Sequence, residues 1–243
     1  MPFRRPLKRA RASRLAWAGA ALCLALTAAC SRAPVVTEQP PGLSVVDGRP
    51  VLRGGERLVL DVSVHQGGID WQRAAGDGVA GAYVKASEGG DFRDRRFADN
   101  WRALRRAGLQ RGAYHYFTFC RHGAEQAANF LAAAPPDKAA LAPAIDIETA
   151  GNCSLRPMRA DLLAELQAFL RPIEAAWGRE VVLYTSYGLD TAYGLTSALD
   201  RPLWVRSIDS RPGGDWRLWQ ASATGRVAGI AGRVDLNVLR SEP

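Results

Sequence analysis

The stretch Pro143-Ala-Ile-Asp-Ile-Glu148 carries two carboxylates two residues apart at the end of a short apolar run. Successive side chains of a β-strand point to opposite faces, so Asp146 and Glu148 face the same way, opposite to Ile145 and Ile147. Two neighbouring acids cannot both ionise cheaply, so we expect one to have a raised pKa while the other stays charged. That pairing suits acid-assisted cleavage of a glycosidic bond. Two solvated acids at a strand edge would give the same pattern.

On both sides of this stretch, strand patterns alternate with helix patterns. Strands are expected at 58–64, 80–86, 110–119, 144–148, 181–186, 203–205, 217–220 and 234–238. Helices are expected at 70–76, 94–107, 123–134, 157–177 and 191–199, with little helix in the tail. Repeated strand–helix units imply a parallel sheet, and eight strands suggest that it closes. We predict the α/β class and a single TIM-like barrel of eight strands with fewer than eight helices.

Further acids lie near the ends of other apolar runs. Asp61 stands in Val59-Leu-Asp-Val-Ser, Glu88 follows Tyr83-Val-Lys-Ala-Ser, and Asp235 stands in Arg233-Val-Asp-Leu-Asn-Val. Each acid by itself is as compatible with a helix cap or a solvated loop. In a closed parallel barrel, however, the strand ends meet at one mouth, where such barrels carry their chemistry. We therefore expect these acids to converge there.

The charge of the chain does not indicate a nucleic-acid partner. The formal net charge is +8, but six of the basic residues lie within residues 1–29, which contain no acid. The remainder has 26 basic and 24 acidic residues, a net charge of +2. The high pI therefore reflects the N-terminus rather than a basic surface of the folded domain.

The N-terminus is typical of an export signal. A basic segment precedes the apolar run 15–29, which is too short for a comfortable transmembrane helix. The run ends in Leu26-Thr-Ala-Ala-Cys30, which resembles a bacterial lipoprotein box. We expect residues 1–29 to be a lipoprotein signal peptide and Cys30 to be lipidated, with signal cleavage nearby and an incidental Cys30 as the alternative. The protein would be exported and membrane-anchored, facing the periplasm or the cell surface.

Residues 30–56 are rich in Pro, Gly, Val and Arg and are expected to be a tether with a hairpin around Asp47-Gly48. The catalytic barrel domain would then span 57–243. Apart from Cys23 and Cys30, the chain has two cysteines, Cys120 and Cys153, just after neighbouring strands. An exported protein meets an oxidising compartment, so we expect these two to form a disulfide. Two thiols that stay free are the alternative.

Several motifs together resemble family 25 glycoside hydrolases, the Chalaropsis-type lysozymes or N-acetylmuramidases. They run in the family's order from residue 58 to residue 239. The motifs are Asp61-Val-Ser-Val-His-Gln-Gly67, Gly78, Tyr83-Val-Lys-Ala-Ser-Glu-Gly89, Phe92, Asp94, Gly112-Ala-Tyr-His-Tyr116, Asp146-Ile-Glu148, Leu183-Tyr-Thr-Ser186, Leu218-Trp-Gln220 and Val234-Asp-Leu-Asn-Val238.

The resemblance implies cleavage of the β-1,4 bond between N-acetylmuramic acid and N-acetylglucosamine in peptidoglycan. Glu148 would be the general acid, Asp146 its charged neighbour, and Asp61 and Asp235 the other acids of the site. The substrate's own 2-acetamido group would be the nucleophile, as in one exception to the two-carboxylate rule, with a direct protein nucleophile or an inverting reaction as the alternatives. The residues expected to bind substrate are Tyr184, Glu88, Lys85, Tyr114 and Trp219.

Some positions depart from the family pattern. The chain has Leu203-Trp-Val-Arg-Ser where Trp-Ile-Ala-x-Tyr is common, Val64-His65 where His-Trp often follows Asp-Val-Ser, and Trp-Gln-Ala-Ser222 rather than Trp-Gln-Tyr. The expected acids are all retained. Contacts to the sugars, and with them substrate preference, are therefore more open than the chemistry.

Two alternatives remain at this point. The barrel could bind peptidoglycan without cutting it, although a pure binding module would not need Glu148. It could also be a metal-dependent hydrolase using His65, Asp61 and Asp146, although the chain has three His in total and no paired-His spacing. We expect no cofactor, no metal and a monomer, with peptidoglycan glycan strands and the membrane as its partners.

Overall fold

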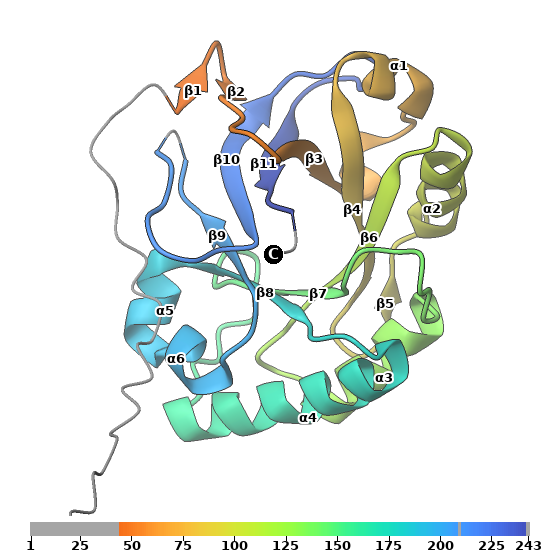
Figure 1. Ribbon diagram of the computed structural model, residues 1–243. Coiled ribbons are helices and arrows are strands. Elements are labelled where there is room, and N and C mark those ends of the chain that lie inside the picture. Colours follow the sequence, from red (N-terminus) through yellow and green to blue (C-terminus); the bar gives the residue numbers. More distant parts are fainter. Residues whose placement is uncertain (1–43, 209, 242–243) are drawn as a thin grey trace, which may run out of the picture. The chain divides into compact units, whose positions relative to one another are not determined.

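Eight strands close into a barrel in the computed structural model, which describes residues 44–208 and 210–241 (Figure 1). The strands are β3 (Arg57–Val62), β4 (Val79–Glu88), β6 (Gln110–Tyr116), β7 (Ala144–Ile147), β8 (Val182–Ser186), β9 (Leu203–Arg206), β10 (Leu218–Gly225) and β11 (Val234–Leu239). Each pairs with its successor along the chain, and β11 pairs with β3 to complete the ring. A two-residue strand, β5 (Phe92–Arg93), extends β4 as a hairpin. The predicted α/β barrel is confirmed.

The last strand runs against the expected direction. Seven strands are parallel to their neighbours, but β11 pairs antiparallel with both β10 and β3. The connection between β10 and β11 covers only residues 226–233. A parallel crossover needs about a dozen residues or more, so this short connection can only reverse the chain. The fully parallel sheet that we predicted is wrong at this strand.

Six α-helices and one 3₁₀ helix are found in the described residues. They are η1 (Val64–Gln66), α1 (Trp71–Gly76), α2 (Phe97–Arg106), α3 (Gly123–Ala133), α4 (Arg159–Trp177), α5 (Tyr187–Tyr193) and α6 (Leu195–Leu199). The predicted helix 191–199 is in fact two short helices separated by Gly194, which has a positive φ of 58°. The described residues between β9, β10 and β11 contain no helix (Figure 1), in line with the predicted helix-poor tail.

The apolar side chains form two separate cores. One lies outside the barrel, where the helices cover the strands, and includes Phe130, Leu166 and Phe169. The other lies inside the barrel and contains Val59, Tyr83, Leu141, Ala144, Val182, Tyr184, Trp204, Leu218 and Leu239. This inner core fills the lower part of the barrel, as in TIM-like barrels generally. The bottom is therefore closed, and a site can open only at the other end.

The end of the predicted tether packs onto the barrel domain. Strands β1 (Val45–Val46) and β2 (Arg49–Pro50) form the expected hairpin, and a buried ion pair joins Glu56 Oε1 to Arg211 Nη1 at 2.6 Å. The chain is thus attached to the domain before residue 57. The predicted signal peptide, Cys30 and the first part of the tether lie outside the described residues. Within residues 44–208 and 210–241, no helix has the length and apolar character needed to cross a bilayer.

Candidate active site

A polar cavity of about 240 Å³ opens at the mouth of the barrel, above the inner apolar core. The residues that line it are Asp61, Tyr114, Asp146, Glu148, Tyr184, Trp204, Arg206, Gln220, Ala223 and Asp235. The alternation of the strands explains this layering. On β3, β7 and β10 an apolar residue of the inner core is followed two positions later by a polar one that faces the cavity. Four of the five acids expected to converge meet here, whereas Glu88 does not line the cavity.

Asp146 and Glu148 form the first carboxyl pair. They share a hydrogen bond at the end of β7, and Asp146 is the register partner of Tyr184 on β8. Burial, together with the charges of Glu148 and Asp61, raises the pKa of Asp146 well above its usual range. Burial also raises the pKa of Glu148, although Asp146 and Arg206 oppose that rise. The free site therefore favours a proton on Asp146, the reverse of the expected distribution.

Asp61 and Asp235 form the second pair. They are register partners on β3 and β11, and their side chains are hydrogen-bonded. Asp235 is the second residue of its strand. It reaches the mouth only because β11 is antiparallel, which brings its N-terminal end beside the C-terminal ends of the other strands. Burial and the charge of Asp61 raise the pKa of Asp235 to about 8. Asp235 is thus the proton donor within this pair at neutral pH.

Two amide side chains, which we did not single out from the sequence, hold Asp61. Asp61 Oδ2 accepts hydrogen bonds from Asn237 Nδ2 at 2.8 Å and from Gln220 Nε2 at 3.3 Å. Tyr184 OH donates to Gln220 Oε1 at 2.9 Å, and Trp204 Nε1 donates to Asn237 Oδ1 at 2.8 Å. Asn237 could have been found, because it stands two residues after Asp235 and therefore shares its face.

Lys85 and Glu88 face the barrel mouth as an ion pair, with Nζ 2.6 Å from Oε2. A regular strand would direct residues three apart to opposite faces. The register of β4 against β6 shifts between Lys85 and Ser87, so Glu88 comes opposite Tyr116. Lys85 Nζ also lies 4.9 Å from the centre of the Tyr116 ring. Tyr114 lines the cavity, whereas Lys85 and Glu88 stand beside it.

Two aromatic side chains lie outside the barrel rather than in the cavity. Trp219, expected to bind substrate, is fully buried and donates its Nε1–H to Ser207 O, so the structure does not bring it to the site. The strand phase is the reason, because Leu218 and Gln220 on either side of it face inward. Trp204 lines the cavity instead. His115 is buried between β6 and the helices, where it is hydrogen-bonded to Ser87 and Gln126.

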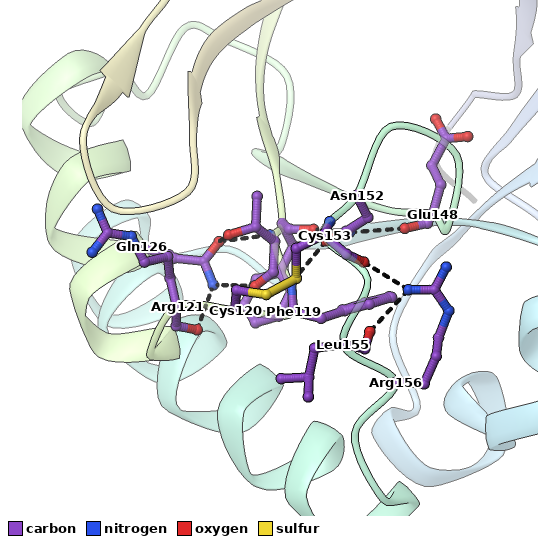
Figure 2. Close-up of a disulfide and its surroundings, with 11 residues drawn as sticks. Phe119, Cys120, Arg121, Gln126, Glu148, Asn152, Cys153, Leu155 and Arg156 are labelled. Carbon is purple, nitrogen blue, oxygen red and sulfur yellow. Dashed lines mark hydrogen bonds between the residues drawn. A yellow bond between two sulfur atoms is a disulfide. The ribbon is translucent and has the colours of Figure 1, made fainter.

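The predicted disulfide between Cys120 and Cys153 is confirmed, with Cα atoms 6.2 Å apart. Figure 2 shows Asn152 between this bond and the backbone of Glu148. Asn152 Nδ2 donates to Phe117 O at 2.8 Å and to Glu148 O at 2.9 Å, and Oδ1 accepts from Phe119 N at 2.9 Å. The loops after β6 and β7 are thus joined directly behind Glu148, whose carboxylate points away from the disulfide (Figure 2).

The described residues contain no group of three or more His, Cys, Asp or Glu side chains arranged to hold a metal ion. His65, which the metal-dependent alternative needs beside Asp61 and Asp146, is exposed on η1 and does not line the cavity. Two hydrogen-bonded carboxyl pairs facing one cavity can instead donate and accept protons without a metal.

Comparisons with known proteins agree with this geometry. A family model described as "Glycosyl hydrolases family 25" matches residues 60–230. The chain is 34% identical to the uncharacterized protein YegX of Escherichia coli K12 over 191 residues, covering 74% of this chain and 68% of that one. It is 30% identical to Lysozyme M1 of Streptomyces globisporus, covering 88% and 85% of the two chains. A solved family 25 glycosyl hydrolase from Bacillus anthracis superposes with a TM-score of 0.72 at 30% identity, covering 82% and 95%.

Proposed function

Because the chain belongs to glycosyl hydrolase family 25, we propose that it cleaves the β-1,4 bond between N-acetylmuramic acid and N-acetylglucosamine in peptidoglycan. The observation that carries the proposal is the pair Asp146 and Glu148, hydrogen-bonded to each other in the cavity at the barrel mouth. A glycoside hydrolase of this kind needs one carboxyl group that gives a proton and a second carboxylate beside it.

Glu148 is the proton donor in this mechanism. It is the less deeply buried member of the pair, lies just after β7 and faces the cavity, so it can reach the oxygen of the scissile bond. Its proton passes to that oxygen as the bond to the anomeric carbon breaks. In the second step Glu148 takes a proton from the incoming water, which restores the starting state.

Asp146 assists through the substrate's acetamido group. Its Oδ1 is buried and makes no hydrogen bond with any described residue, so it is a ready acceptor for an amide N–H. The acetamido oxygen forms the bond to the anomeric carbon, and an ionised Asp146 stabilises the positive charge that develops on the group. Since the free site favours a proton on Asp146, binding must transfer that proton to Glu148 along their shared hydrogen bond.

Asp61, Asp235, Tyr184 and Tyr114 complete the proposed site, and Lys85 and Glu88 bind the glycan at its edge. Two amide side chains hold Asp61 and so fix its orientation toward the cavity. We further propose that the protein is exported, lipidated at Cys30 and active as a monomer at a membrane surface.

Reducing-end analysis tests this function. Digestion of purified peptidoglycan should release glycans with muramic acid at the reducing end, both with and without a chelator. Release of a glucosamine end would refute the proposed bond. Binding to the wall without release of any fragment would favour the alternative, a peptidoglycan-binding barrel module.

Glu148→Gln tests the role of the proton donor. The variant keeps the size and most hydrogen bonds of the side chain but has no transferable proton. Activity should fall by about 10²–10⁴-fold with the melting temperature retained. Glu180→Gln, at an exposed glutamate between α4 and β8, is the matched control and should keep full activity. Wild-type rates in folded Glu148→Gln would remove Glu148 from this role.

A further inference from the structure

Arg206 is a cation in the cavity that the proposed mechanism does not use. It ends β9, with Ser186 on β8 and Gln220 on β10 as its register partners. It lines the same cavity as Glu148 and Asp235, and it is exposed. Its guanidinium makes no hydrogen bond or ion pair with any other residue in 44–208 and 210–241.

The other cation near the mouth differs in this respect, because Lys85 is paired with Glu88 at 2.6 Å. A guanidinium presents five N–H donors in a planar fork that matches a carboxylate. An exposed fork inside a sugar-binding cavity is therefore suited to an anionic group on the ligand. The ligand group must be carried close to the scissile bond, because Arg206 shares the cavity with the residues that act on that bond.

We propose that Arg206 binds the free lactyl carboxylate of a muramic acid residue whose stem peptide has been removed. This inference rests on the proposed function. The lactyl ether is attached to the sugar ring at the carbon next to the one that bears the acetamido group. If Asp146 holds the acetamido group, the lactyl group lies on the neighbouring part of the same ring. Stem-peptide carboxylates are the other possible source of this chemistry, but they lie several bonds further from the ring.

The proposal places the enzyme after another class of reaction. The lactyl carboxylate of intact peptidoglycan is tied up in an amide bond to the stem peptide. A free carboxylate is produced only when that amide is hydrolysed. The enzyme would then act most efficiently on glycan strands that an amidase has already stripped.

The test compares one glycan in two charge states. Peptide-free glycan strands carry the free lactyl carboxylate, and conversion to the methylamide removes its charge. Wild-type kcat/KM should be about 10-fold or more higher on the carboxylate form. Arg206→Ala should lose about that factor on the carboxylate form, chiefly through KM, and less than about 3-fold on the methylamide. Arg206→Lys should recover part of the loss.

Comparing the two glycans separates recognition of the carboxylate by Arg206 from an effect of Arg206 on the pKa of the catalytic acids. Arg206 also opposes the rise in the pKa of Glu148 and of Asp235, but removing that influence changes the rates on both glycans alike. Arg226→Ala is the charge-matched control, because Arg226 is exposed just after β10 and does not line the cavity. It should leave the rates on both glycans unchanged.

Three outcomes would contradict the proposal in distinguishable ways. Equal losses on the two glycans would overturn carboxylate recognition while leaving the muramidase function intact. If Arg206→Ala lost more kcat/KM on intact, peptide-bearing peptidoglycan than on the peptide-free carboxylate glycan, Arg206 would bind stem-peptide carboxylates. That result would overturn the lactyl assignment. A wild-type enzyme that cleaves none of these substrates would refute the proposed function itself.

Discussion

At the residue scale, the site depends on how its protons are distributed among four acids. In each pair one carboxyl group is more deeply buried than the other: Asp146 lies deeper than Glu148, and Asp61 lies deeper than Asp235. Burial raises the pKa of all four groups. Such coupled groups titrate as pairs, so two protonation steps are expected in the pH profile. The profile of kcat/KM should accordingly be bell-shaped.

Asp146→Asn probes the assisting carboxylate. The variant cannot ionise, so it cannot stabilise the charge that develops on the acetamido group. We expect kcat to fall by about 10²–10³-fold, with a smaller change in KM, and one limb of the pH profile to disappear. Asp161→Asn, an exposed acid on α4, serves as the control. A rise in KM alone would make Asp146 a binding residue and remove the main support for assistance by the substrate.

Asp235→Asn probes the second pair through stability. The pKa of Asp235 is raised from 3.8 to about 8 in the folded protein, so the folded state keeps a proton that the unfolded chain releases. Its stabilising contribution is complete below about pH 4 and is lost as the pH rises through about 8. Between pH 5 and 7 the wild type should lose about 1.4 kcal/mol more per pH unit than Asp235→Asn.

Thermal melts across this range measure the difference. For a protein of this size, 1 kcal/mol corresponds to about 2–4 °C in melting temperature. The wild-type melting temperature should therefore fall more steeply with pH than that of the variant, by about 3–6 °C per pH unit. Parallel slopes for the two proteins would show that Asp235 does not hold the proton.

At the element scale, the loops after β6 and β7 act together. The disulfide spans 33 residues of sequence, and Asn152 bonds the carbonyls of Phe117 and Glu148. Replacing both cysteines with Ser should cost about 3–4 kcal/mol in the chain-entropy model, or roughly 6–16 °C in melting temperature. Below that temperature, kcat should also fall, because the backbone of Glu148 is less firmly held.

Asn152→Ala separates the two parts of this support. It leaves the disulfide in place but removes the hydrogen bond to Glu148 O, so kcat should fall with less loss of melting temperature than in the double Ser variant. As a positioning residue, Asn152 should change kcat more than KM. If neither variant alters kcat, the two loops stabilise the fold without positioning the acid.

At the scale of the whole molecule, the proposed anchor sets where the barrel works. The structured domain is attached from Ser44 onward, so only residues 31–43 separate it from Cys30. A chain of that length can span at most about 45–50 Å, which keeps the active site near the membrane. Cys30→Ser should release the protein into the soluble fraction after cell fractionation. Continued membrane association of this variant, with no lipid label on the wild type, would contradict the anchor.

Much of this protein follows from local pattern. Asp146 and Glu148 could be paired from sequence because an i, i+2 spacing places side chains on one face whatever the rest of the chain does. The disulfide followed from two cysteines at the ends of consecutive strands. The barrel followed from the number and alternation of the elements. These inferences needed only the geometry of single strands and their order along the chain.

Other features were decided by the way in which the strands meet. The direction of β11 depends on its closing pairing with β3, and that direction alone brings Asp235 to Asp61. Whether Trp204 or Trp219 faces the cavity depends on which side chains of its strand point inward. The sequence around Trp219 does not reveal this, because both faces of strand β10 are buried there. The bulge that turns Glu88 inward arises from the register with β6. The pKa shifts, too, exist only once burial and neighbouring charges are in place. Sequence by itself therefore determined most of the candidate site residues, and tertiary contacts between distant strands decided which of them meet and in what charge state.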